Sequence, residues 1–402
     1  MYIPVFFPPV LRIAVASAVA VALASTAQAQ AEEEADWQEE LEALEREWEE
    51  MEREWEEFIR AVPPTWMHLF SLQGGIGYND NVLRSSVSRE SSVFLQTGFD
   101  TTLWKNPRAE GPRYHMFLFG EGRHYIGNRD LDDDYILSLR GEGIYELPSE
   151  WSAVLPVNLD YNDEYVDVST REAELDTIRF RGVGIGFSPA LRYDLSDSDR
   201  VEGKAIVRRQ QFSDPLDPYW ETGGGLSWRH AADSATTFNF GSRVLFRRYD
   251  NREARDADGA ILPGTRREFG IYHFDASVNH YWDEARRWRS RATAGAEINR
   301  DNAEGYFDFL RTHLSHRLIY QSRPWRIDTG LRYSHYQYDV RRTADGESNL
   351  NRRIVTADLR AELAVTHNLN LYSEYRHENV HSNETDSGYR VNTVLTGVEW
   401  LF

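Results

Sequence analysis

The residues of this sequence that could do chemistry are mostly charged side chains placed at every second position. Arginines recur in this way in four segments of the second half of the chain: Arg243 and Arg247, Arg289 and Arg291, Arg311 and Arg317, and Arg326 and Arg332. Such spacing puts side chains on one face of a β-strand, because successive side chains of a strand point to opposite faces. On neighbouring strands these arginines would form a basic wall, which favours anions.

Acidic side chains take the same kind of position in earlier segments, at Glu121, Asp134, Glu142 and Asp160. We therefore expect an acidic arc on a different part of the same structure. Two interpretations remain open. The two charged surfaces could face each other across water and orient polar solutes that pass between them. Alternatively, the charges could satisfy one another in ladders of ion pairs.

No set of residues with the spacing of a known catalytic centre stands out. Cysteine is absent, which excludes disulfides and thiolate chemistry, and no G-x-S-x-G motif is present. His313 and Ser315 alternate on one segment and His335 follows on the next, but the 12 histidines are scattered. The acidic runs 130–134 and 256–259 lack the full spacing of a calcium loop. We expect no enzyme, no cofactor and no metal site.

Alternating apolar residues supply the elements that would position these charges. From Trp66 onward the sequence shows sixteen segments with a period of two, of which Tyr389–Phe402 is the clearest. Short connectors such as 148–150 and 283–285 alternate with longer ones at 162–176, 250–267 and 341–352. This pattern, with 13% aromatic residues and a mean hydropathy of -0.60, predicts an all-β fold. We expect residues 65–402 to form a transmembrane antiparallel β-barrel of about sixteen strands, with fourteen or eighteen as alternatives.

The first 29 residues resemble a secretory signal peptide. Arg12 precedes an apolar run at 13–24, and Ala27-Gln28-Ala29 matches a small-x-small cleavage site. The apolar run is shorter than the roughly 20 residues that a transmembrane helix needs. Residues 1–29 are therefore predicted to be removed on export.

Residues 30–64 differ sharply in composition from the rest of the chain. Between Ala31 and Arg60 there are 15 acidic residues and 3 arginines, which gives a net charge of -12. Apolar residues repeat with an average spacing of 3.5, which predicts a coiled-coil-like α-helix that ends at Pro63-Pro64. The predicted seam consists of Trp37, Leu41, Leu44, Trp48, Met51, Trp55 and Phe58. The helix either docks on a basic surface, such as a basic periplasmic protein or the arginine wall inside the lumen, or acts as a solvated periplasmic spacer.

Two short motifs resemble those of known families. The alternation of Val398, Trp400 and the C-terminal Phe402 resembles the recognition signal of bacterial outer-membrane barrel proteins, which implies contact with the barrel-assembly machinery. The segment Gly74–Arg84, GGIGYNDNVLR, looks like the first-strand motif of porin-like barrel families, some of which are associated with exopolysaccharide loci. Asn79 stands where that motif commonly has an acid, which argues against ion binding there.

These features together predict a location and two competing functions. We expect the outer membrane of a Gram-negative bacterium, with lipid and lipopolysaccharide as neighbours. A net charge of -20 argues against nucleic acid as a partner. The first hypothesis is a porin-like channel for polar or anionic solutes or for a polysaccharide. The second is a structural or assembly barrel whose helix recruits a periplasmic partner or serves the export of surface proteins.

Overall fold

A computed structural model describes residues 65–402, apart from 88, 107–110, 128–130, 132, 168–176 and 385–386. The predicted signal peptide and the predicted acidic helix, including the whole seam from Trp37 to Phe58, lie outside the described residues. Among the residues that are described, no helix is long and apolar enough to cross a membrane.

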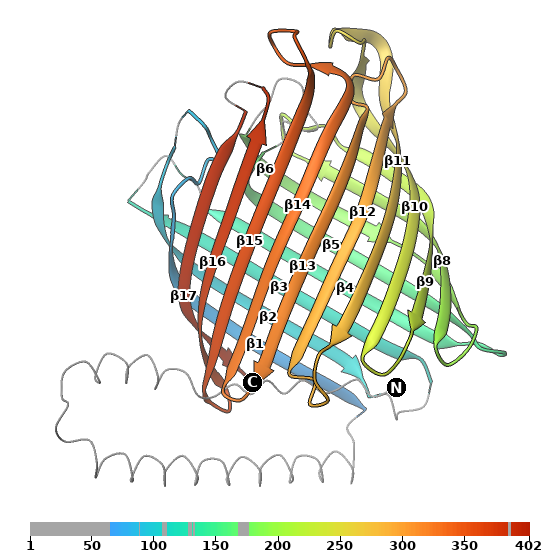
Figure 1. Ribbon diagram of the computed structural model, residues 1–402, viewed down its shortest axis with the longest axis vertical. Helices are drawn as coiled ribbons and strands as arrows, with labels where there is room; N and C mark the ends of the chain where they lie inside the picture. Colours follow the sequence, from blue (N-terminus) through green and yellow to red (C-terminus); the bar gives the residue numbers. More distant parts are fainter. Residues whose placement is uncertain are drawn as a thin grey trace.

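The described chain is a succession of antiparallel β-strands (Figure 1). Their bounds are β1 Trp66–Asn79, β2 Ser92–Lys105, β3 Arg113–Ile126, β4 Asp134–Glu146, β5 Trp151–Asp167, β6 Thr177–Phe187, β7 Ala190–Asp194, β8 Asp199–Phe212, β9 Tyr219–Ala231, β10 Thr236–Arg255, β11 Ile261–Tyr281, β12 Trp288–Asp301, β13 Phe309–Ser322, β14 Trp325–Arg342, β15 Asn349–Thr366, β16 Leu369–Ser382 and β17 Tyr389–Leu401.

The sheet closes on itself. Each span pairs with its neighbours in the chain, and β1 pairs with β17 from Ser71 opposite Leu401 to Asn79 opposite Thr393. β6 and β7 form one span, because both pair with β5 and with β8 and only Ser188-Pro189 separates them. Proline lacks the N–H that a ladder needs, which explains the interruption. The described strands therefore make sixteen spans, and the sixteen-strand antiparallel barrel is confirmed.

The two ends of the barrel differ. One end, which we call the turn end, carries short connections such as 147–150 and 323–324 together with the C-terminus (Figure 1). The opposite loop end carries connections such as 80–91, and the β10–β11 hairpin rises beyond it. All three long connectors expected from sequence are shorter than predicted, and at the first of them β5 continues through 162–167. Strand pairing continues through much of 250–267 and 341–352 and leaves only 256–260 and 343–348 outside the strands.

Register divides the side chains between two faces. Large apolar side chains that remain exposed, such as Ile76, Phe246 and Leu314, at 56%, 58% and 58%, share one face. The other face must be the inner, concave one, because its side chains reach one another past an intervening strand. Arg360 on β15 lies 3.7 Å from Glu399 on β17, past the intervening β16. In the same way Arg84, just after β1, donates a hydrogen bond to the carbonyl of Tyr165 on β5 at 3.0 Å.

Candidate functional site: the inner face

The inner face holds all eight arginines of the predicted basic wall. Register places them on four spans, β10, β12, β13 and β14, at positions that alternate with exposed apolar residues. Arg243 and Arg247 lie on β10, and Arg291 on β12 stands directly opposite Arg317 on β13. Ser315, two residues before Arg317, is opposite Arg332 on β14. The arginines therefore occupy one continuous arc of the interior.

Five of these arginines have an acidic partner on the same arc or on a strand that borders it. The closest contacts join Arg317 Nη2 to Asp328 Oδ2 at 2.5 Å and Arg247 Nη2 to Glu221 Oε2 at 2.9 Å. Arg243, Arg311 and Arg326 lie 3.9, 3.3 and 3.6 Å from the oxygens of Asp275, Glu297 and Glu362. None of these five acids is among the predicted site residues, although each occupies an inward position of the same alternation. Over part of the arc, the arginines therefore form the ladder of ion pairs that was the second of the two interpretations.

Three arginines of the arc lack an acidic partner in the part of the chain that the structure describes. The guanidinium of Arg289 lies 5.8 Å from the centre of the Tyr281 ring, a cation–π contact. Arg291 and Arg332 are both exposed although they point inward. They lie two strands apart and are offset by two residues, so their Cα atoms are separated by about 12 Å. These two side chains leave uncompensated positive charge facing open space inside the barrel.

The predicted acidic residues also point inward, on β3, β4 and β5. Glu121 pairs with Arg123 at 2.8 Å, and Asp134 accepts a hydrogen bond from the Tyr125 hydroxyl at 2.5 Å. Asp160 accepts a hydrogen bond from the Ser138 hydroxyl at 2.8 Å and lies 3.7 Å from Arg208. Glu142 has no ion pair or hydrogen bond to another described residue. Further inward acids that sequence reasoning missed extend this arc across the junction of β1 and β17: Asp100, Glu164, Glu374, Glu378 and Glu399.

The two charged arcs lie on opposite sides of the interior. β12, in the middle of the basic arc that runs from β10 to β14, is seven spans of sixteen from β4, in the middle of the predicted acidic arc. Because the sheet closes between β1 and β17, half the circumference is eight spans, so the middles of the two arcs lie almost opposite each other. Charges arranged in this way produce an electric field across the interior rather than along it.

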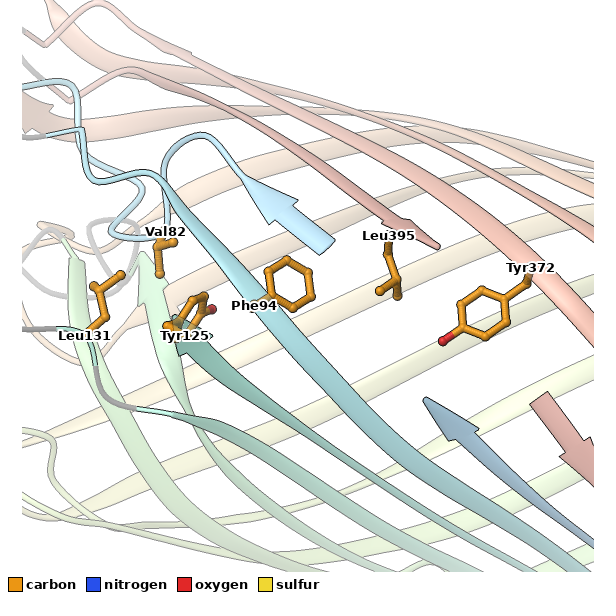
Figure 2. Close-up of a cluster of buried hydrophobic side chains, with 6 residues drawn as sticks. All are labelled: Val82, Phe94, Tyr125, Leu131, Tyr372 and Leu395. Atoms are coloured by element: carbon orange, nitrogen blue, oxygen red, sulfur yellow. The ribbon is translucent and has the colours of Figure 1, made fainter. Parts of the chain in front are cut away.

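The loop between β1 and β2 folds inward and narrows the loop end. Val82 is 4% exposed and belongs to a cluster with Phe94, Tyr125, Leu131 and others (Figure 2). Phe94 and Tyr125 are inner-face residues of β2 and β3, so Val82 packs against the inside wall. A cavity of about 100 Å³ lies beside this loop, and charged groups of both signs line it, among them Arg123, Glu164 and Arg376. The apolar cluster thus holds the loop against one side of the interior.

The glycine-rich motif that leads into this loop has a structural role. The Asn79 carboxamide oxygen accepts a hydrogen bond from the backbone N–H of Asn81 at 2.9 Å. Asn81 is fully buried, and its side-chain N–H groups donate to the carbonyls of Ser85 and Arg390 at 2.9 and 3.1 Å. Asp80 accepts two hydrogen bonds from Asn392 on β17. The motif therefore ties the end of the first strand to the last strand.

The residues considered for catalysis do not assemble. His313 and Ser315 point inward from β13, whereas His335 on β14 pairs with Thr312 and points outward. His313 instead lies 3.4 Å from Asp275. Its ring passes so close over Gly295 that a Cβ at that position would clash with it. Within the described ranges, no group of three or more His, Asp or Glu side chains is arranged to hold a metal ion.

The C-terminal residues face outward. Val398, Trp400 and Phe402 are 45%, 51% and 61% exposed. The backbone N–H of Phe402 donates to the carbonyl of Phe70 at 2.8 Å, which anchors the terminal residue to β1. Their recognition by assembly machinery stays a prediction.

The closed sheet, its apolar outer face and its charged inner face define the transmembrane β-barrel class. No protein-family model matches the chain, and no curated protein matches it in sequence. Solved structures with a similar arrangement include Acinetobacter baumannii OccAB4, at 9% identity and a TM-score of 0.47, covering 83% of this chain and 98% of that one. A bacterial polysaccharide outer membrane secretin has 8% identity and a TM-score of 0.41, with 84% and 98% covered. Pseudomonas aeruginosa OccK11 has 14% identity and a TM-score of 0.42, with 84% and 96% covered. Likeness at this level does not extend to function, which we infer from the chain's own residues.

Proposed function

We propose that this protein is an outer-membrane channel for polar solutes, with a preference for anions. The outer face supplies the apolar surface that lipid requires, with aromatic residues such as Trp325 and Tyr333 at the two limits of the apolar stretch on β14. The turn end faces the periplasm in this proposal, because short turns mark that side in outer-membrane barrels. The outer-membrane location also accounts for the outward C-terminal aromatic residues.

The observation that carries the channel proposal is the state of Arg291 and Arg332. Both side chains point inward, are exposed and lack an ion pair to any described residue. A guanidinium that is neither paired nor buried needs water around it, since leaving a charge in a dry interior is prohibitively costly. We infer that water fills this part of the lumen and that the two arginines raise the local concentration of anions.

The opposed arcs support selectivity beyond charge alone. Consider a solute that is anionic at one end and cationic or dipolar at the other. It would turn its negative end toward β12–β14 and its other end toward β3–β5. The ion pairs on both arcs hold the lining side chains in place, so that the field keeps a fixed direction. Small carboxylated or phosphorylated solutes and acidic polysaccharides both fit this description.

Single-channel recording in planar bilayers tests the proposal. We expect stepwise conductance with anion preference for the wild-type protein. The variant R291Q/R332Q should lower the anion-to-cation permeability ratio roughly threefold or more, since potentials in charged clefts amount to several kT. R248Q is the control, because Arg248 lies on the outer face, where its side chain pairs with Glu268 at 3.1 Å.

Two outcomes would contradict the proposal. Unchanged selectivity in R291Q/R332Q would show that these arginines do not face the conducting path. A folded barrel that never conducts, and that copurifies with a basic periplasmic protein, would favour the rival function as an anchor for the acidic segment 30–64.

A further inference from the structure

We propose that phosphate groups of lipopolysaccharide bind to a patch on the outer face of β14–β17, close to the loop end. The patch consists of His335, Arg353, His381 and Arg390, with the carboxamide of Asn379 among them. This proposal rests on the outer-membrane location proposed above, but it concerns the lipid side of the wall rather than the lumen.

Register brings the patch together from four successive spans. His335 on β14 stands opposite Arg353 on β15, and Arg353 stands opposite His381 on β16. Asn379, two residues before His381, is opposite Arg390 on β17. Residues directly opposite have Cβ atoms about 5 Å apart, and diagonal neighbours are about 7–8 Å apart. The two arginines are thus close enough to contact one phosphorylated headgroup.

The patch lies immediately above the apolar part of the outer face. On β14 the outward positions from Trp325 to Tyr333 are apolar except for Thr329, and His335 is the next outward position. The same change occurs on β15 between Val355 and Arg353, and on β17 between Val394 and Arg390. From Trp325 to Tyr333 the strand runs about 26 Å, which a tilt of about 40° reduces to about 20 Å along the barrel axis, so this stretch spans most of the roughly 25 Å apolar band of barrel proteins. The patch therefore sits at headgroup level.

The cations of this patch are not neutralised by neighbouring acids among the described residues. Arg353 and Arg390 are exposed, and neither has an ion pair there. The acids on the adjoining strand ends make their close contacts with other residues. Asp339 forms an ion pair with Arg300, and the Asp80 carboxylate accepts hydrogen bonds from Asn392. Other outward arginines near the loop end differ in this respect. Arg181 lies 2.8 Å from Asp163, and Arg248 lies 3.1 Å from Glu268.

Phosphate is the anion that this chemistry fits best. Arginine presents a fork of N–H donors that matches phosphate oxygens, and the histidine and asparagine side chains add further donors. A phosphate attached to a lipid would have its acyl chains lie along the apolar strands just below. Free phosphate would lack that second contact and would bind far more weakly.

Native mass spectrometry of the full protein in lipid nanodiscs tests the proposal. The probe is lipopolysaccharide added in known amounts, with its phosphatase-treated form as the comparison. For R353Q/R390Q we expect roughly 30-fold weaker retention, at about fivefold for each charge near an anionic surface. The wild type and R248Q should retain the lipid equally, and the phosphatase-treated form should bind each protein weakly. Millimolar inorganic phosphate should leave the wild-type complex intact.

Equal retention by R353Q/R390Q and the wild type, or equal binding of the two lipid forms, would overturn the proposal. Release by inorganic phosphate would overturn the lipid source of the phosphate. Heat-modified migration on a gel checks that R353Q/R390Q is folded, and the single variants R353Q and R390Q provide intermediate cases. Lipid binding is measured without conductance, so a silent barrel that still retains lipopolysaccharide would refute the channel and leave this site standing.

Discussion

Asp80, the first residue after β1, accepts two hydrogen bonds from Asn392 of β17. The backbone N–H of Asn392 donates to one carboxylate oxygen and its side-chain N–H to the other, both at 2.6 Å. The carboxamide oxygen of Asn392 in turn accepts from Tyr375 and contacts His377 Nδ1 on β16, at 2.9 and 2.8 Å. One carboxylate thus connects the first strand to the last two strands, at the loop end of the junction of β1 and β17.

The substitution D80A should weaken the barrel at the junction of β1 and β17. It leaves the Asn392 donors without their acceptor, and an unsatisfied donor costs about 1–3 kcal/mol. Urea unfolding of the refolded protein in detergent, followed by tryptophan fluorescence, measures the free energy of unfolding. D258A is the matched control, because Asp258 is an exposed loop carboxylate whose oxygens have no hydrogen bond to another described residue. Equal losses in the two variants would refute the role assigned to Asp80.

The two faces of β13 should respond in opposite ways to the same new charge. Leu314 is 58% exposed on the outer face near the middle of the strand, and Ser315 points inward opposite Arg332. L314E should destabilise the protein by about 1–2 kcal/mol in lipid vesicles, because a carboxylate then faces hydrocarbon. S315E should be nearly neutral, because water and Arg332 receive the charge.

Urea titrations of the two variants in vesicles, with the wild type beside them, measure this difference. If S315E were the more damaging of the two, the assignment of inner and outer faces would be wrong. Repeating the titration in detergent provides a control, since the penalty for L314E should shrink where water reaches the outer face.

The turn between β9 and β10 should contribute stability that depends on pH. The Asp233 carboxylate accepts hydrogen bonds from the backbone N–H groups of Ala235 and Thr236 at 2.7 and 2.6 Å, which hold its pKa below the ordinary value. A lowered pKa means that the folded state favours the ionised form. The stabilisation is therefore complete above the unfolded value of about 3.9 and is lost as the pH falls through the lowered folded pKa.

The variant D233A checks this sign. Its free energy of unfolding should lie below that of the wild type at pH 7, and the gap should close as the pH is lowered past about 4. A gap that stays constant down to about pH 2.5 would mean that the carboxylate is not held in its charged form by the turn.

Much of the barrel could be predicted because alternation is a local property. A segment such as Tyr389–Phe402 reports which residues face lipid without any knowledge of its neighbours, and the inward position of Arg291 or Glu121 follows from the same rule. The count of spans also survived the break at Pro189, because the residues on both sides keep one alternation. The length of the long hairpins was harder to predict, because strand pairing above the membrane imposes no apolar pattern on 250–255 or 261–267.

Ion pairing could not be predicted because it depends on register. Glu297 becomes the partner of Arg311 only through the exact offset of β12 against β13, which a single sequence does not specify. The same applies to Asn79, Asp80 and Asn81. Their resemblance to a family motif marked the segment, but their partners Arg390 and Asn392 lie more than 300 residues further along the chain.

β17, the most C-terminal of the described strands, closes the barrel by pairing with β1. Gln73 on β1 and Glu399 on β17 are neighbours in space, yet 326 positions separate them. Energetically this distance is a minor obstacle, because each doubling of a loop adds only about 0.6 kcal/mol. A product without β17 would keep the earlier hairpins, but its two edge strands, β1 and β16, both pair antiparallel with β17 and therefore run in the same direction. The antiparallel ladder that closes this barrel could then not form.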